Sequence, residues 1–118
     1  MKDQKKNEPL DLDHMVRELG CVDTAKRILQ RYAQHTEIQI ERLQEAINSG
    51  TMSEIHRISH SVKGGAMNIG ADRLVETART LEFAAKSEQL ENAPFFIQDI
   101  KKAFSDVQRA IIIITREN

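Results

Sequence analysis

A chain of 118 residues is long enough for one domain with a real core and too short for two. Its 40% hydrophobic and 30% charged residues, with five glycines and two prolines, are typical of a soluble, mainly helical protein. A formal net charge of -1 excludes a strong basic field, so we expect neither nucleic acid nor a membrane as a partner. The single cysteine excludes an internal disulfide, and the chain carries neither a signal segment nor a membrane-length apolar run. We therefore expect a cytoplasmic protein.

The N-terminal segment divides into a tail and a short helix. Residues 1–8 are polar and charged, so we expect a disordered lead-in before a single domain over residues 9–118. Pro9 suits the first turn of a helix, because its missing N–H has no partner there anyway. Apolar residues at three- and four-residue spacing then predict a short helix over about 10–19, ending at Gly20.

A long helix is predicted next, over about 23–48. Asp23 is a plausible N-cap, and Gly50 suits the position just beyond the end. The helix carries one continuous apolar stripe at helical spacing, made of Ala25, Leu29, Tyr32, Thr36, Ile40, Leu43 and Ile47.

Three more helices complete the chain. Thr51 and Glu54 have the spacing of a capping box, and the helix that they open ends at Gly70. Another helix starts at Ala71 and Asp72, and a last one follows Asn92 to near the C-terminus. Four long amphipathic helices joined by short loops predict an all-α protein, an antiparallel up-down four-helix bundle with a short N-terminal helix capping one end.

His60 lies on the outer face of the third predicted helix. The apolar stripe of that helix is made of Ile55, Ile58, Val62, Ala66 and Ile69. At about 100° per residue, His60 lies about 160° from the centre of this stripe, so the position argues against a core histidine. An ordinary surface histidine remains an alternative.

The residues after His60 leave its surroundings open. Gly64 is one turn on and Met67 nearly two turns on, both on the outward face, so no bulky side chain directly follows the imidazole. Lys63 is close enough to neutralise an anion on the ring. Gly65 points towards the core, where its missing side chain permits close helix packing. An exposed imidazole with a cation and a cleared approach is suited to accepting a phosphoryl group and handing it on.

The same stretch resembles a known family. The residues His60-Ser-Val-Lys63-Gly64-Gly65-Ala-Met-Asn-Ile-Gly70-Ala, followed by Leu74 and by Thr80-Leu81-Glu82, are similar to the signature of histidine phosphotransfer (HPt) domains. That signature is a histidine, a lysine three residues on, a glycine four on and a glycine ten on. The resemblance extends over the chain from about residue 10.

The resemblance implies a phosphorelay intermediate that is not itself an enzyme. His60 is then phosphorylated on Nε2 by the aspartate of one receiver domain and passes the phosphoryl group to another receiver. Lys63 balances the phosphate charge. Glu82, about 80° from the apolar stripe of its helix, accepts a hydrogen bond from Nδ1–H and orients the ring. The chain needs no cofactor of its own, and Mg²⁺ is expected in the partner receiver.

The resemblance also implies the partners. Receiver domains of response regulators, a hybrid sensor histidine kinase, or both, are expected to dock around Gly64, Met67 and Ile38. We expect a monomer, and the initial methionine together with a complete bundle favours a free-standing protein.

Two other functions fit parts of the sequence. His56 and His60 are four residues apart, the spacing that lets two imidazoles share Zn²⁺, but no third or fourth ligand has a converging spacing. An adaptor bundle that binds receivers without accepting phosphate shares the fold and the surface. The joint presence of His60, Lys63, Gly64 and Glu82 argues against it.

Overall fold

The computed structural model describes residues 8–116, so the predicted disordered lead-in lies, except for Glu8, outside the described residues. The described chain is helical and contains no strand. The helices are α2 (Leu12–Leu19), α3 (Val22–Ser49), α4 (Met52–Asn68), α5 (Asp72–Lys86) and α6 (Ala93–Arg116). The predicted all-α class is confirmed.

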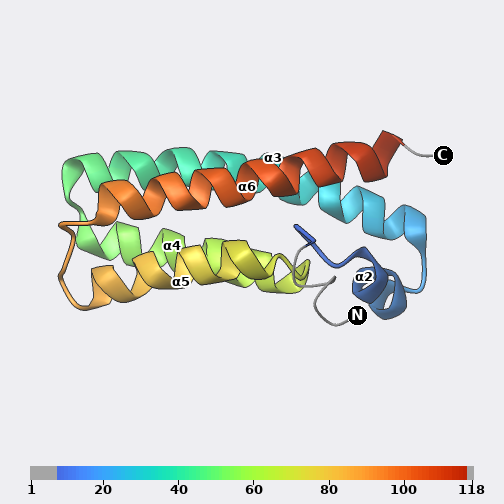
Figure 1. Ribbon diagram of the computed structural model, residues 1–118, viewed down its shortest axis with the longest axis horizontal. Helices are drawn as coiled ribbons and strands as arrows, with labels where there is room; N and C mark the ends of the chain where they lie inside the picture. Colours follow the sequence, from blue (N-terminus) through green and yellow to red (C-terminus); the bar gives the residue numbers. More distant parts are fainter. Residues whose placement is uncertain (1–7, 117–118) are drawn as a thin grey trace.

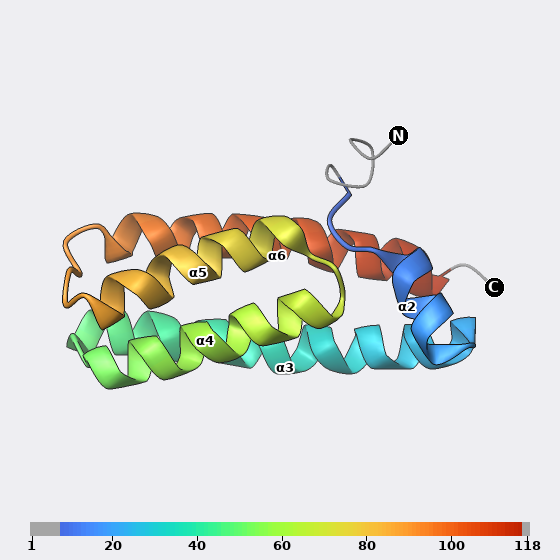
Figure 2. The same cartoon turned by 90° about the horizontal axis from the view of Figure 1, so that it is seen from below.

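The four long helices form an up-down bundle, with each helix running opposite to the one before it (Figure 1). Helices that follow one another in the chain pack side by side, and α6 returns to pack against α3. Helix α2 crosses the N-terminal end of α3 and caps that end of the bundle (Figure 2). Within residues 8–116, no helix is both long enough and apolar enough to cross a bilayer.

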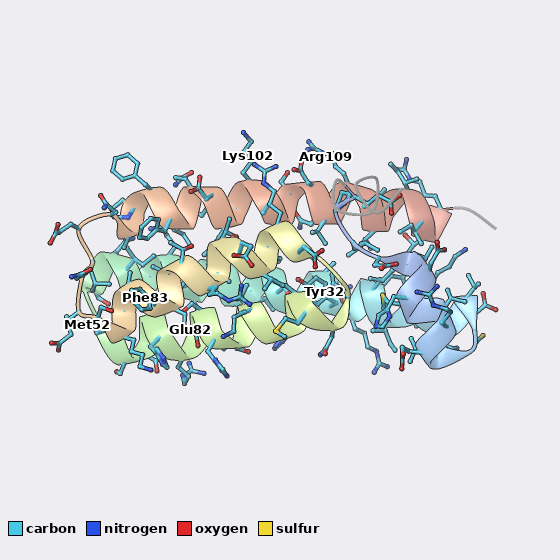
Figure 3. The ribbon with its side chains drawn as sticks, turned by 60° about the horizontal axis from the view of Figure 1, so that its bottom comes forward. Tyr32, Met52, Glu82, Phe83, Lys102 and Arg109 are labelled. Carbon is cyan, nitrogen blue, oxygen red and sulfur yellow. The ribbon has the colours of Figure 1, made fainter. Side chains whose placement is uncertain are left out.

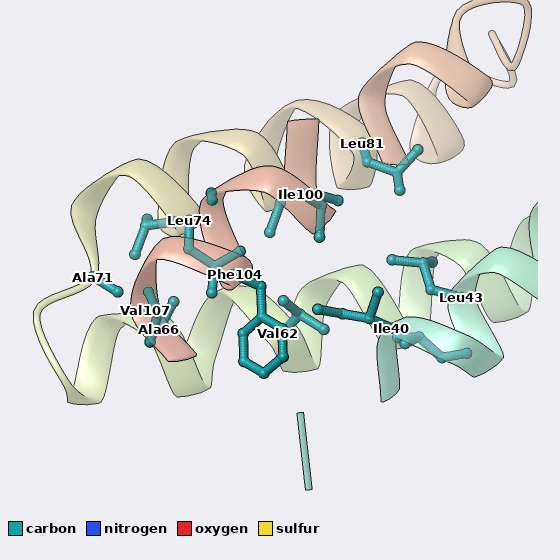
Figure 4. Close-up of a cluster of buried hydrophobic side chains, with 14 of the residues drawn as sticks. Ile40, Leu43, Val62, Ala66, Ala71, Leu74, Leu81, Ile100, Phe104 and Val107 are labelled. Atoms are coloured by element: carbon teal, nitrogen blue, oxygen red, sulfur yellow. The ribbon is translucent and has the colours of Figure 1, made fainter. Parts of the chain in front are cut away.

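Each helix of the bundle contributes a fully buried aliphatic side chain to the core (Figure 4). Leu43 comes from α3, Val62 from α4, Leu81 from α5 and Ile100 from α6, each at most 1% exposed. Burying a side chain of this size stabilises the fold by about 1.5–3 kcal/mol. The apolar stripe predicted for α4 is buried throughout its length, and this burial fixes the rotation of α4 in the bundle.

Three glycines end helices or close turns, as the sequence predicts. Gly20, Gly50 and Gly70 have φ values of 74°, 68° and 68°, in the left-handed region that side chains with a Cβ rarely adopt. Gly65 has a different role. A Cβ on Gly65 would lie 3.2 Å from Cε1 of Tyr32, so its missing side chain lets α3 and α4 pack closely, as predicted.

The start of α2 differs from the prediction. Pro9 lies before the helix rather than in its first turn, and Asp11 is the N-cap, its Oδ1 accepting from the His14 backbone N–H at 3.0 Å. The Asp11 backbone N–H donates to the Ile69 carbonyl at 2.9 Å, and Leu10 is buried. The Asp11 hydrogen bond joins this segment to the α4–α5 turn, and the helix begins only beyond it.

Asp23 is not the N-cap of α3. The cap is Cys21, with extended backbone at φ −155°, so α3 begins at Val22, directly after the Gly20 turn. Asp23 therefore falls in the first turn, where a carboxylate stabilises the helix dipole.

The capping box predicted at the start of α4 is also wrong. Thr51 occupies the N-cap position, but its side chain makes no capping hydrogen bond. The Thr51 hydroxyl hydrogen-bonds with the Ser49 hydroxyl instead, at 2.9 Å. Both carboxylate oxygens of Glu54 accept from the Arg57 guanidinium. The Thr51 backbone N–H, which a capping box would pair with Glu54, donates to the Ala46 carbonyl at 3.0 Å.

Gly70→Ala is expected to destabilise the protein more than Gly50→Ala. Both substitutions put a Cβ into left-handed backbone, which costs about 1–2 kcal/mol. At Gly70 the new Cβ would also lie 2.6 Å from the Asp11 Cβ, whereas at Gly50 it meets nothing within 4 Å. Steric overlap of this kind adds about 1–3 kcal/mol. Urea unfolding of the two variants measures the difference; equal losses would show that the Asp11 segment moves aside at no cost.

Candidate functional site

The His60 side chain projects from α4 into solvent and is 66% exposed. Its direction follows from the packing of α4, because Ile58 and Val62 on either side of it turn into the core. Helix α3 is fastened beside it, since the Gln39 side-chain amide donates to the Ser61 hydroxyl at 2.7 Å. The outward direction that the sequence predicts for His60 is confirmed.

Glu82 of α5 lies between His60 and Lys63 and joins them. Its Oε2 is 2.5 Å from Nδ1 of His60, and its Oε1 accepts from Nζ of Lys63 at 2.6 Å. The Glu82 side chain is only 13% exposed, at the place where α5 meets α4 (Figure 3). The two helices therefore build one cluster, with the nucleophile and the cation on α4 and the carboxylate on α5.

The pKa of Glu82 is lowered from its ordinary value. Burial raises it, but the hydrogen bonds from Lys63 and His60, together with their charges, lower it by more. An ionised carboxylate only accepts hydrogen bonds, so the proton between it and His60 belongs to Nδ1. In a neutral ring this leaves Nε2 with a free lone pair. The ionised Glu82 also stabilises the folded protein at neutral pH, a contribution that is lost as the pH falls through the lowered pKa.

His56 lies one turn before His60 on the same face. The two rings are nearly parallel, with an interplanar angle of 11° and centroids 6.4 Å apart. Nε2 of His56 is 3.9 Å from Oε2 of Glu82, the oxygen that faces His60. Within residues 8–116, no group of three or more His, Cys, Asp or Glu side chains is placed to hold a metal ion. Among the described residues, the structure therefore supplies no further side chain that would complete a metal site with His56 and His60.

The remaining predicted site residues lie outside the hydrogen-bonded cluster. Gly64 is exposed, and a Cβ on it would meet nothing within 4 Å, so the surface beyond His60 is open. Met67 on α4 and Ile38 on α3 are exposed apolar side chains, at 57% and 49%. Their part in docking stays a prediction.

Phe83 is not among the residues predicted from the sequence, yet it is 67% exposed on α5 next to Glu82. A signal for it exists in the sequence, because a large aromatic residue stands outside the apolar stripe of its helix. Phe83 lines a hollow of the surface together with Lys63 and Glu82, so α5 contributes an aromatic ring as well as the orienting carboxylate to the surroundings of His60.

An exposed histidine whose Nδ1 is held by a carboxylate, on one helix of an antiparallel bundle, defines a candidate phosphocarrier of the histidine phosphotransfer class. The chain belongs to the Hpt domain family, whose model matches residues 27–110. Family membership supports a phosphotransfer role in two-component systems, in which HPt domains act as phosphocarriers.

Two solved structures share the fold. One is histidine-containing phosphotransfer protein B (HptB) from Pseudomonas aeruginosa PAO1, with a TM-score of 0.87 and 24% identity over 95% of this chain and 98% of that one. The other is the HPT domain from the Hpt sensor hybrid histidine kinase from Shewanella, with a TM-score of 0.79 and 15% identity over 93% and 96% of the two chains. A search of curated proteins gives no match.

Proposed function

We propose that His60 accepts a phosphoryl group from the aspartate of one receiver domain and passes it to the aspartate of another. The observation that carries this proposal is the cluster of His60, Glu82 and Lys63 on the open face of an Hpt-family bundle. Glu82 holds the proton on Nδ1, which leaves Nε2 of the exposed ring as the free nucleophile. The sequence pattern alone could not distinguish this arrangement from an unsupported surface histidine.

The transfer is a displacement at phosphorus. The Nε2 lone pair attacks the phosphorus of the aspartyl phosphate, an N–P bond forms, the P–O bond to the aspartate breaks, and the carboxylate leaves with the bonding electrons. The ring keeps its Nδ1 proton and becomes positively charged, and this charge faces the Glu82 carboxylate. Lys63 lies beside the same carboxylate and is within one turn of the phosphorylated ring, where it offsets the phosphoryl charge. The second transfer reverses these steps.

This chain supplies a positioned nucleophile, and the rest of the catalytic machinery belongs to the partner. Mg²⁺ and the acidic pocket are expected in the receiver domain. The partners are response-regulator receivers, a hybrid sensor kinase, or both. A monomer in the cytoplasm is the form that we expect to act.

Phosphate transfer from a charged receiver tests the proposal. The protein is incubated with each of the host's receiver domains, previously phosphorylated with acetyl phosphate and Mg²⁺. We expect at least one receiver to label the protein with a phosphate that is lost in acid and kept in base, as a phosphohistidine is. Failure of every receiver to label it contradicts the proposal and favours an adaptor bundle. An acid-stable label contradicts the assignment of His60 as the phosphate acceptor.

Lys63→Ala is expected to slow this transfer about tenfold, the lower end of the effect of removing a supporting partner. The reason is that the phosphoryl charge loses its neighbouring cation. The pKa of Glu82 should rise as well, because Lys63 is a main cause of its lowering. Transfer reactions quenched at successive times measure the rate of phosphate transfer, and an NMR titration of the Glu82 carboxyl measures its pKa. Lys102→Ala, at an exposed position of α6, is the control. A wild-type transfer rate in Lys63→Ala would show that Lys63 only stabilises Glu82 and takes no part in phosphate transfer.

A further inference from the structure

A groove of about 310 Å³ runs beside the phosphoacceptor cluster on its α5 side. It is lined by His56, Lys63, Arg79, Glu82, Phe83 and Lys86. Two of these residues, Lys63 and Glu82, belong to the cluster around His60. The groove is therefore continuous with the site and lies on the α5 side of α4, whereas the predicted docking residue Ile38 belongs to α3, on the other side.

The charge of the groove is positive. Lys63, Arg79 and Lys86 line it together with the titratable His56, and Glu82 is its single carboxylate. That carboxylate already faces Lys63 and His60. Arg79 is paired with Glu76, whereas Lys86 has no ion-pair partner among residues 8–116. An occupant of matching chemistry carries carboxylates.

Phe83 gives the groove an apolar rim. At 67% exposed, its ring is in contact with water in a protein whose other α5 apolar residues are buried. Aromatic side chains are enriched in protein–protein interfaces, where a few of them carry most of the binding energy. Figure 3 places Phe83 directly beside Glu82, at the same end of α5.

Phosphate transfer requires a receiver to cover more of the surface than the His60 cluster alone, and the groove lies within reach of that contact. A stable complex buries about 800 Å² on each partner, far more than one imidazole and its neighbours offer. A domain that brings its aspartate to Nε2 of His60 must therefore cover surface on one or both sides of α4. The groove is the side that combines an exposed aromatic ring with unneutralised positive charge.

We propose that the groove between α4 and α5 is a docking surface for the receiver domain, which inserts an apolar side chain against Phe83 and presents carboxylates to Lys86 and Arg79. This inference rests on the proposed function. It extends the partner surface from the predicted residues Gly64, Met67 and Ile38 across α4 onto α5. It also specifies the partner: a receiver whose docking face is both apolar and acidic.

The test compares two phenylalanines. Phe83 and Phe95 are exposed to a similar degree, 67% and 70%, but Phe95 lies in the first turn of α6 and does not line the groove. The transfer rate is measured against the concentration of the phosphorylated receiver that labels the wild-type protein fastest. Phe83→Ala should raise the half-saturating concentration about tenfold with the maximal rate unchanged, the effect of losing one interface hot spot. Phe95→Ala should leave it within about twofold.

Two lysines test the charge in the same way. Lys86→Gln should raise the half-saturating concentration and weaken its dependence on salt, because a cation facing the partner is lost. Lys102→Gln makes the same charge change on α6, outside the groove. It should alter neither the half-saturating concentration nor its dependence on salt.

Three results overturn the inference. Equal effects of Phe83→Ala and Phe95→Ala would remove any special role of the groove. Slower phosphorylation of Phe83→Ala by the small donor phosphoramidate, which needs no docking, would mean that the substitution disturbs the site itself. A wild-type dimer that Phe83→Ala converts to a monomer, with transfer unchanged, would assign the groove to a second copy. A wild-type protein that no receiver labels would instead contradict the proposed function and the inference together.

Discussion

His60→Gln is expected to remove all phosphate labelling and to leave the bundle nearly as stable as the wild-type protein. Glutamine has no nucleophilic ring nitrogen, so no phosphoryl group can be accepted at this position. The His60 side chain is 66% exposed and contributes nothing to the core, and the substitution removes at most its one hydrogen bond to Glu82, so the free energy of unfolding should fall by about 1 kcal/mol or less. Label stoichiometry from a charged receiver and thermal unfolding measure the two quantities on one preparation.

Two other histidines provide matched controls. His35 is exposed on α3, and His56 lies one turn before His60. Both His35→Gln and His56→Gln should reach the wild-type label stoichiometry. Labelling of His60→Gln, or its marked loss of stability, would contradict the assignment. Loss of the label in His56→Gln alone would move the nucleophile one turn towards the N-terminus.

Glu82→Ala is expected to slow transfer about 10- to 100-fold, the range seen when the partner of a functional histidine is removed. The carboxylate lies 2.5 Å from Nδ1 and keeps the proton there. Without it the proton can move to Nε2, which then lacks the lone pair that attacks phosphorus. Nitrogen NMR of the His60 ring reports this directly, because the two tautomers have different ring-nitrogen shifts.

The conservative variant separates the two effects of Glu82. Glu82→Gln keeps an oxygen that accepts from Nδ1–H but loses the charge that faces Lys63, so its transfer rate should lie between those of Glu82→Ala and the wild-type protein. Leu81→Ala is the structural control, because truncating a fully buried leucine lowers the free energy of unfolding by about 2–5 kcal/mol. A rate loss in Glu82→Ala without a change of ring tautomer would show that Glu82 acts through Lys63 alone.

Leu81, Glu82 and Phe83 show which side-chain positions the periodicity of a helix can predict and which it cannot. The spacing of apolar residues correctly puts Leu81 in the core and Glu82 at its boundary. Phe83 cannot be assigned this way, because periodicity describes the buried face and is silent about an apolar residue outside it. Its proximity to the site appears only when α5 packs against α4.

The structure differs from the sequence-based predictions at the starts of helices. Asp23, Thr51 and Glu54 are residue types that commonly cap helices. Asp23 is not a cap because α3 begins one residue before it. Thr51 and Glu54 make hydrogen bonds with other partners. Each alternative partner is a near neighbour: Ser49 for Thr51, and Arg57 for Glu54. Short polar side chains have several partners within reach, and small differences in turn geometry decide between them.

The sequence by itself determined the helices, their glycine ends and the outward direction of His60, because these depend on a repeat of 3.6 residues and on backbone angles that glycine adopts most readily. The tertiary structure decided which atoms meet. It placed one carboxylate of α5 between His60 and Lys63, aligned His56 with the same oxygen and set Phe83 at the rim of a basic groove. Periodicity fixes an angle around one helix axis, whereas a hydrogen bond between helices also requires their separation, rotation and register, which the packing of the whole core sets.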